Sequence, residues 1–454
     1  MTYPTRTATS LSRRRFLRTV GVGMGALALG PLGSRVGQAQ DGPIKIGVIA
    51  PLIFNFSIGV GLKRGVEIAR DEINDAGGIL GRPVELIIED NALDPRVAVQ
   101  KYQKLVTQDN VVAVTGGFLD ETTLPIVNNV LPRLKTPFLN SGTATSETTE
   151  LVRNDYENFK YYFKLMLSTD VLTEDTANAA QGLYVDQLGL RNVALVSEDG
   201  SFGRDFEAFL KTKLPEIGLN IPDGASFRFP QDGQFDFSNV LAQTEDAGAE
   251  AFVVAFIRNN GFSFVRQWHD QGPRLPVLGI NVSGQAFEYW SQTEGKVISH
   301  VYADAATGAT AVTEKTLPFF NTYVQRHQSE SPPTRPLFTS YTTYDALYVL
   351  KQAMERIGEA PPAPSDAEAF AGYREQLVPS LEQTDWVGTV GQIRFQGPDD
   401  ERPHNPVNRT EEGDPLVVPK WVQWQPGEAN RPDRKVVYPA TYKNSEIMLP
   451  PEMG

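Results

Sequence analysis

Short polar segments that follow apolar ones are the part of this chain whose residue types suit binding chemistry. Gly116-Gly117 follows one apolar segment, and Ser141-Gly142-Thr143 follows another. Hydroxyl groups and the N–H groups at the start of a helix both attract a carboxylate. Hydroxyl side chains are equally common as helix caps, so capping is the alternative for any single one. These segments predict a small-molecule site with Ser141, Gly142 and Thr143 among its contacts.

Apolar and aromatic side chains occur in the same set of loops. Residues 51–58 carry two phenylalanines and two isoleucines, and Gly117 is followed by Phe118 and Leu119. The sequence favours a rather apolar cleft. Its apolar candidates in these loops are Phe56, Ile58, Phe118 and Leu119.

The motifs of several enzyme classes are absent from the sequence. The chain has no cysteine, which excludes disulfides, thiolate metal sites and a cysteine nucleophile. Its four histidines are far apart and lack the spacing of metal ligands. Neither G-x-S-x-G nor a P-loop occurs. The glycines from Gly59 onward come too late after the preceding strand for a dinucleotide-binding loop. We therefore predict no enzyme activity, catalytic residue, metal or cofactor.

The elements that must position these loops alternate between strand and helix. Buried strands are predicted at 44–50, 83–89, 111–115 and 136–139 from their length and β-branched content. Helices are predicted between them at 59–76, 95–108 and 120–134. This order indicates a parallel sheet that is covered on both faces. In such a sheet, ligands bind beyond the carboxyl ends of the strands, where the candidate loops lie.

A second α/β series begins after residue 168. Strands are predicted at 192–197, 251–256 and 276–280, with helices between them, and a late strand is predicted at 420–424. Two series in one chain predict two doubly wound lobes, each with a Rossmann-like sheet. The length of the chain also favours more than one domain.

The first 39 residues have the composition of an export signal. The twin arginines Arg13-Arg14 precede an uncharged stretch at 20–32, and small residues lead to Ala39. A membrane anchor is the alternative, but that stretch rises only about 20 Å as a helix, less than the ~30 Å hydrocarbon core. We expect a Tat-type signal peptide cleaved after Ala39 and a periplasmic protein that does not span a membrane.

The remainder of the chain is strongly acidic. Residues 1–39 hold six arginines and no acidic residue, so the formal charge of −13 for the whole chain becomes −19 without them. Such a surface repels nucleic acid and anionic lipid, and neither is expected as a partner.

Several short segments form an ordered series along the chain. They are Pro51-Leu52, Glu72-Ile73-Asn74-Asp75-Ala76-Gly77-Gly78, Asp90-x3-Asp94-Pro95, Ser197-Glu198-Asp199-Gly200-Ser201-Phe202-Gly203 and Tyr341-x2-Tyr344-Asp345. In this order and spacing, between about Ile44 and Ile357, they resemble the periplasmic branched-chain amino-acid-binding proteins. That group is the leucine/isoleucine/valine-binding family of ABC importers.

The resemblance implies a type I periplasmic binding fold, with two lobes joined by three crossing strands near Leu167, Tyr302 and Val387. The N-terminal lobe would comprise residues 40–167 and 303–387, and the C-terminal lobe residues 168–302 and 388–454. It also implies a monomer that captures a small solute by lobe closure and delivers it to an inner-membrane ABC permease. The alternative is a ligand sensor of the same fold that partners a receptor or kinase.

Departures from the family pattern concern the ligand. The family's carboxylate-binding serine falls near Asp120 here, which would repel a ligand carboxylate. We favour Asp120 as a helix cap, which leaves backbone N–H groups and Thr122 or its neighbour Thr123 to bind. The family's ammonium-binding glutamate falls at Asn281, an amide that forms weaker bonds to an ammonium group.

The resemblance also places an aromatic wall at Phe202 and near Phe256, and core packing is the alternative for both. Arg258 offers a charge for an anion. We expect an amino acid, amide or small carboxylate, and not a simple branched-chain amino acid.

Overall fold

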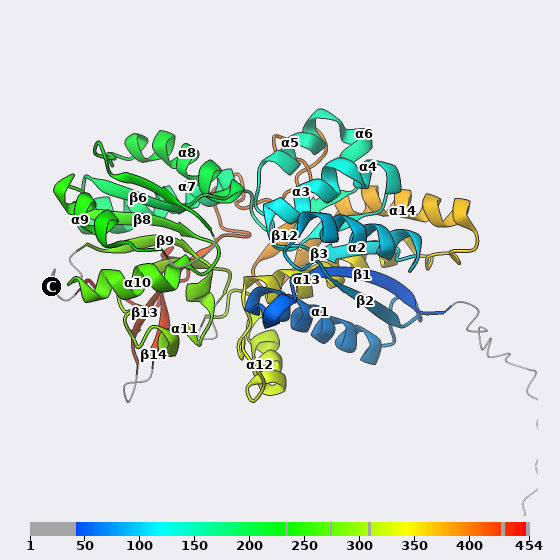
Figure 1. Ribbon diagram of the computed structural model, residues 1–454. Helices are drawn as coiled ribbons and strands as arrows, with labels where there is room; N and C mark the ends of the chain where they lie inside the picture. The colour runs from blue at the N-terminus through cyan, green and yellow to red at the C-terminus, as the bar shows by residue number, and fades with distance from the viewer. Residues whose placement is uncertain (1–41, 232–234, 273–274, 307–309, 428–431, 451–454) are drawn as a thin grey trace, which may run out of the picture. The chain divides into compact units, whose positions relative to one another are not determined.

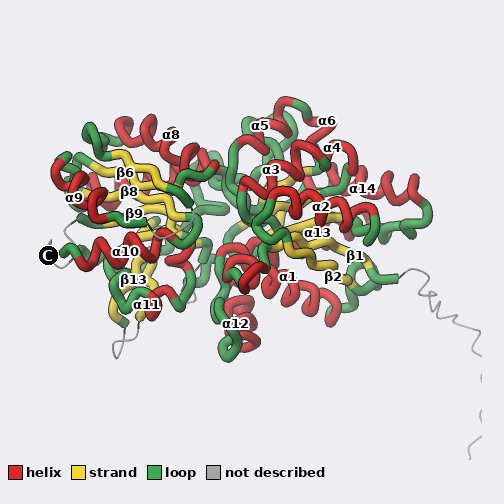
Figure 2. The backbone as a smooth tube through the Cα atoms, in the orientation of Figure 1, coloured by secondary structure: helices red, strands yellow, loops and turns green. Residues whose placement is uncertain are grey.

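The computed structural model describes residues 42–231, 235–272, 275–306, 310–427 and 432–450. The predicted signal peptide lies outside these residues. The chain from Asp41 onward forms one compact unit. Within it, strands gather into two separate sheets that are flanked by helices (Figure 2).

The first sheet is entirely parallel and has the order β2-β1-β3-β4-β5. Its central strand β1 has five consecutive buried residues at its end, the pattern of a strand covered on both faces. The strands are β1 (Ile44–Ala50), β2 (Val84–Asp90), β3 (Ala113–Gly116), β4 (Phe138–Asn140) and β5 (Tyr162–Lys164).

Helices from two distant parts of the chain cover the first sheet. The most extensive contact between two elements joins α1 (Ser57–Asp75) to α13 (Phe338–Ile357), and both helices touch the sheet. In Figure 1, α1 and α2 lie on either side of β1. The others are α2 (Pro95–Thr107), α3 (Asp120–Asn129), α4 (Leu131–Leu134), α5 (Glu147–Asn154), α6 (Tyr156–Phe159), α12 (Thr316–His327) and α14 (Ala367–Glu382), with a short 3-10 turn at Ile53–Asn55.

The second sheet has the order β14-β13-β10-β9-β8-β6-β7, and only its two last strands in the chain run antiparallel to their neighbours. Figure 1 shows α7 and α8 on one side of this sheet and α10 on the other. The strands are β6 (Val193–Glu198), β7 (Ser226–Phe229), β8 (Ala251–Phe256), β9 (Val277–Asn281), β10 (Val301–Asp304), β13 (Lys420–Pro426) and β14 (Pro432–Tyr438). The helices are α7 (Thr169–Ala180), its π-helical continuation Gln181–Gln187, α8 (Ser201–Glu216), α9 (Ser238–Asp246), α10 (Asn260–Asp270), the 3-10 turn Ser283–Gln285 and α11 (Tyr289–Gln292).

The two α/β series that the sequence predicted are confirmed, with one helix divided. The predicted helix 120–134 is interrupted at Val130, after which α4 begins with Pro132 in its first turn. Proline removes a backbone donor and clashes with the preceding turn, so one continuous helix is disfavoured there.

The chain passes between the two sheets three times. The first passage follows β5 and precedes α7, close to the expected Leu167. The second follows β10, just after the expected Tyr302. The third does not occur near Val387. A small hairpin of β11 (Asp385–Val387) and β12 (Gln392–Arg394) comes there instead, and the passage comes between Val417 and β13.

Residues 395–406 therefore lie with the first lobe, although we assigned everything after residue 387 to the second. The backbone N–H of Lys164 in β5 donates to the carbonyl of His404 at 3.0 Å. The His404 ring stacks on Phe163 with ring centres 4.0 Å apart. This segment covers β5, the edge strand of the first sheet, whose backbone groups would otherwise lack partners.

No helix in the described ranges combines the length and apolar character needed to cross a membrane.

The contact between α1 and α13 depends on a glycine. A β-carbon added at Gly65 would come within 2.2 Å of the Ser340 carbonyl oxygen, which belongs to the α13 backbone. We expect Gly65→Ala to lower the free energy of unfolding by about 1–3 kcal/mol because the two helices must separate. Urea unfolding measures this change.

The matched control is Gly372→Ala, which lies in α14 where a β-carbon meets nothing within 4 Å. It should stabilise the protein by roughly 0.5–1 kcal/mol because glycine is a poor helix former. Equal effects of the two substitutions would contradict the close approach of α1 and α13.

Candidate functional site

A cavity lies where loops at the carboxyl ends of both sheets meet. It contains about 940 Å³ of atom-free space, counting its opening to solvent. The first sheet contributes the segments after β3, β4 and β5, and the second contributes segments after β6, β7, β8, β9 and β10. The start of α13 and residues 417–419 complete the wall. This is the location at which parallel sheets bind ligands.

The wall of the cavity is mainly apolar and aromatic. Phe118 and Phe338 face each other with ring centres 6.3 Å apart, and Phe202 enters from the start of α8. The predicted candidates that line this cavity are Phe118, Leu119, Asp120, Gly142 and Phe202.

Two further hollows adjoin the cavity and receive three further candidates. Phe56 and Arg258 line both hollows, and Ile58 lines one of them. The first hollow shares Phe118 and Leu119 with the cavity, so these residues border both spaces. The sequence placed these side chains in one site, and the structure separates Arg258 from the cavity lining.

The remaining candidates lie outside the lining of the cavity and of both hollows. Phe256 is fully buried among other phenylalanines, including Phe237 and Phe264, so the core-packing alternative describes it. The Asn281 amide donates to the Tyr289 hydroxyl at 3.2 Å and accepts from the Gly284 N–H at 3.2 Å. Both bonds hold the loop after β9 together.

The predicted hydroxyl groups are also directed into the protein. Thr122 donates to the Leu119 carbonyl at 2.9 Å, and Thr143 lies 2.7 Å from the Thr123 hydroxyl. Ser141 is fully buried. These residues shape the loops after β3 and β4. The cavity is lined by other residues of the same loops, such as Leu119, Gly142 and Ala144.

Asp120 does not cap its own helix, which corrects our interpretation of it. Leu119 occupies the N-cap of α3, and one Asp120 oxygen, Oδ1, accepts the N–H groups of Ala144 and Thr145 at 3.2 Å each. The carboxylate thus links α3 to the loop after β4. The correction follows from tertiary packing, because the two amides come from residues more than twenty positions along the chain.

A buried lysine accompanies Asp120. Lys164 at the end of β5 donates to the carbonyls of Ala144 and Thr145 at 3.0 and 2.7 Å. Burial raises the pKa of Asp120 and lowers the pKa of Lys164, while the attraction between the two charges opposes both changes. Lys164 itself does not line the cavity, so Asp120 is the member of this pair that faces it.

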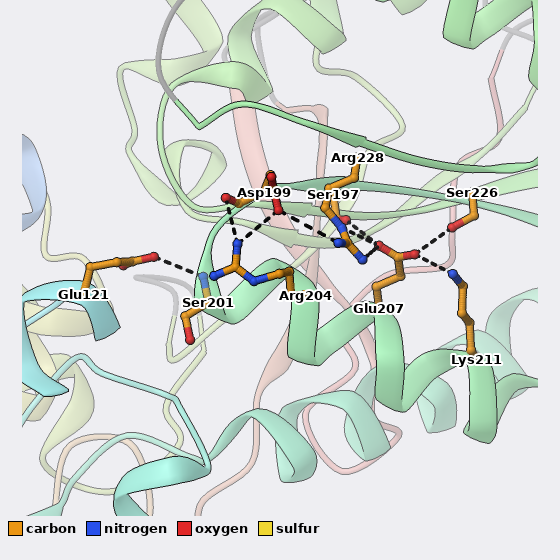
Figure 3. A network of polar contacts seen from close by, with 9 residues as sticks. All are labelled: Glu121, Ser197, Asp199, Ser201, Arg204, Glu207, Lys211, Ser226 and Arg228. Carbon is orange, nitrogen blue, oxygen red and sulfur yellow. Dashed lines mark hydrogen bonds and ion pairs between the residues drawn. The ribbon is translucent and has the colours of Figure 1, made fainter.

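Hydrogen bonds connect the two lobes beside the cavity. The Glu121 carboxylate in α3 accepts from the backbone N–H of Ser201, at the start of α8, at 3.0 Å (Figure 3). On another side, Glu288 accepts from the backbone N–H of Thr334 at 3.0 Å. The Arg335 guanidinium lies 3.7 Å above the Phe287 ring. Each contact joins a first-lobe element to a second-lobe element.

Glu198 is a site-positioning residue that the sequence analysis did not single out. It ends β6, is fully buried, and accepts from the N–H groups of Ile257 and Arg258 at 2.9 and 3.0 Å. It also accepts from the Asn260 side chain at 3.2 Å. These bonds fix the loop that brings Ile257 to the cavity. In the sequence, the position of Glu198 directly before the Asp199-Gly200 turn was the feature that could have identified it.

No cluster of three or more histidine, cysteine or acidic side chains that would suit a metal ion occurs in the described ranges.

The sequence model of the family described as "Periplasmic binding protein" matches residues 43–411. An "Amino acid binding protein" from Pseudomonas aeruginosa is 27% identical over 233 residues, which are 50% of this chain and 58% of that protein. The chain thus matches less than two thirds of the length of this relative.

Two solved structures share the fold. A putative branched-chain amino acid ABC transporter from Silicibacter pomeroyi superposes with a TM-score of 0.74 at 20% identity, over 90% of this chain and 100% of that one. A solute-binding protein of an ABC transporter from Rhodopseudomonas palustris, in complex with 3,4-dihydroxybenzoic acid, has a TM-score of 0.68 at 18% identity. That match covers 91% of this chain and 99% of that one.

The burial of Glu198 gives stability a defined dependence on pH. Burial raises the pKa of Glu198 to about 7 against the opposing effect of its hydrogen bonds, from an ordinary value of 4.5. The folded state therefore favours the protonated acid, and the contribution of Glu198 to stability falls as the pH rises from 4.5 through 7. The total change is on the order of 3 kcal/mol. We expect the stability of Glu198→Gln relative to wild type to increase over this range in urea unfolding.

Glu207 provides a control of opposite sign. Although burial raises its pKa, hydrogen bonds from Lys211, Arg228 and Ser226 lower it below 4.5 (Figure 3). Its contribution is present above pH 4.5 and is lost as the pH falls below that value. A pH-independent difference between wild type and Glu198→Gln would show that Glu198 is not titrating as its burial requires.

Proposed function

Because the chain belongs to the periplasmic binding protein family, we propose that it is the substrate-binding component of an ABC importer. It captures a small solute in the cavity between its lobes and delivers that solute to an inner-membrane permease. The observation that carries this proposal is the cavity, whose wall is built by the strand ends of both sheets. A solute held there touches both lobes.

Lobe closure follows from this division of the wall. A solute that binds only one lobe gains part of its contacts, and the full set exists only when the lobes meet. The bonds from Glu121 to Ser201 and from Glu288 to Thr334 also require both lobes to be together. Solute binding and these bonds therefore favour the same closed state, which is the form that a permease distinguishes from the open one.

The apolar wall supports a solute with a hydrocarbon or aromatic body. The Rhodopseudomonas palustris neighbour was solved with an aromatic acid, and the Pseudomonas aeruginosa relative is named for amino acids. The aromatic side chains Phe118, Phe202 and Phe338 offer faces for such a body in this chain. We place the solute among amino acids, amides and small carboxylates, and the polar groups of the wall narrow this range further.

The remaining parts of the proposal concern location and partners. The protein acts in the periplasm as a monomer, after export through a Tat-type signal peptide that is cleaved following Ala39. It catalyses no reaction and needs no cofactor or metal. The acidic charge of the chain beyond residue 39 argues against nucleic acid as a partner.

A thermal-shift screen of amino acids, amides and aromatic acids tests solute binding. A solute present at 100 times its Kd stabilises the folded state by about 2.7 kcal/mol and raises the Tm. The variant Ala305→Trp should abolish this rise because its ring fills the cavity that Ala305 lines. The control Ala363→Trp, in the loop before α14, should keep it. A complete screen with no stabilising solute would refute the proposal.

Uptake into spheroplasts separates transport from sensing. Added protein should stimulate uptake of the solute found in the screen, and Ala305→Trp should not. Binding without any stimulation of uptake would instead support the sensor alternative.

A further inference from the structure

Five backbone N–H groups in the loops beside the cavity donate to the chain's own carboxylates. Asp120 accepts from Ala144 and Thr145, and Glu121 accepts from Ser201 at the start of α8. Glu198 accepts from residues 257 and 258, just before α10. Helix starts and loops of this kind are general anion-binding positions. In this protein the anion at each of these three positions is internal.

The other N–H groups of the loop after β4 have internal partners as well. Ser141 donates to the Gly116 carbonyl, while Gly142 and Thr143 donate to the Asn140 side chain at 3.2 and 2.7 Å. The start of α3 carries Asp120 and Glu121 in its first turn, so two carboxylates already meet the positive end of its dipole. A solute carboxylate would find the N–H groups of residues 141–145 taken and would face these acids.

The unpartnered polar atoms in the wall are acceptors. Asp120 is 4% exposed, and its second oxygen, Oδ2, has no hydrogen-bond partner among the described residues. Gln285 is 6% exposed; its Nε2 donates to the Ala303 carbonyl, and its Oε1 likewise has no partner. Both residues line the cavity, one from each lobe. A buried acceptor without a donor destabilises the folded state, and a solute that supplies the donor removes this cost.

The charged lining has one sign. Asp120, Glu121 and Asp304 line the cavity, and no arginine, lysine or histidine does so among the described residues. Asp304 is paired with Arg434 at 3.0 Å behind the wall. Arg258 belongs to the adjoining hollows, outside this lining. A carboxylate moved from water into this wall would lose its hydration and gain no opposite charge there.

We propose that the cavity selects a solute with an apolar body and N–H donors, an amide or amine, and rejects the carboxylate of the same skeleton, with Asp120 as the specificity-determining residue. This inference rests on the proposed function and names the substrate class of the same cavity. One N–H group of the solute meets Oδ2 of Asp120, and a second donor reaches Oε1 of Gln285. The apolar body contacts the phenylalanines between them.

Isothermal titration of the purified protein with matched pairs tests the selection. The pairs are 3-phenylpropanamide with 3-phenylpropanoate, and leucinamide with leucine. We expect the wild type to bind the amide of a pair at least tenfold more tightly than its carboxylate counterpart. Leucinamide carries both an amine and a primary amide. Titration with 3-phenylpropylamine, which carries only the amine, shows which of these two donor groups the cavity recognises.

Substitution of Asp120 should weaken the preference for the amide. Asp120→Asn can keep its Oδ1 acceptor for Ala144 and Thr145, while a donor replaces the acceptor that faces the cavity. Asp120→Ser frees the two amides. Both variants should lower the amide-to-carboxylate affinity ratio at least tenfold. The control is Asp94→Ser, since Asp94 also accepts two helix-start amides, from Arg96 and Val97, but lies outside the cavity. Its affinity ratio should equal that of the wild type.

Three results would overturn the inference. The first is wild-type protein that binds the carboxylates as tightly as the amides. The second is an amide-to-carboxylate affinity ratio that is unchanged in a folded Asp120→Asn variant. The third is an absence of binding by every donor probe. If carboxylates from the wider screen bind while the donor probes do not, the solute-carrier function stands and the donor selection fails. If no solute of any class binds, both fail.

Discussion

The direction of the parallel strands determines where this protein can bind a small molecule. In each sheet the parallel strands end at one edge, so the loops that follow them converge even when they are far apart in sequence. Residues after β3 and after β9 thereby face one space. The buried strands supply a rigid base, and the loops are free to carry the polar and aromatic groups that a solute contacts.

Polar groups near the cavity are organised around buried and partly buried carboxylates. Asp120, Glu121 and Glu198 each accept backbone N–H groups of a segment distant in sequence, so each both fixes a loop and neutralises its donors. Lys164 compensates the charge of Asp120 by position, while its own hydrogen atoms go to two carbonyls. Such pairs are retained at a cost in desolvation. Here the result is a wall that is apolar with a few acceptors.

The link between the lobes combines three chain passages with a few polar contacts. Three chain passages connect the sheets, while Glu121 and Glu288 reach across to backbone N–H groups of the opposite lobe. Single hydrogen bonds of this kind contribute about 1 kcal/mol each. Contacts of that strength can be broken and reformed, so the free energy of a bound solute is large enough to bias the lobes toward closure.

The sequence by itself determined the two α/β series, the family resemblance and part of the cavity wall. Periodicity and β-branched content are local properties, which is why the strands and helices could be placed in advance. The loops after the strands, together with the family resemblance, then indicated Phe118, Leu119, Gly142 and Phe202, which line the cavity. The same local pattern cannot distinguish a loop side chain that faces the cavity from one that faces the core. Asn281 and Phe256 accordingly turned inward.

Tertiary structure alone decided the partners of the buried charges. Asp120 bonds to amides of the loop after β4, and residues 395–406 pair with β5 instead of joining the second lobe. Both outcomes depend on which donors and strand edges are left without partners once the sheets have formed. Which groups remain without partners depends on the whole packed structure, so the spacing of residues in the sequence cannot predict it.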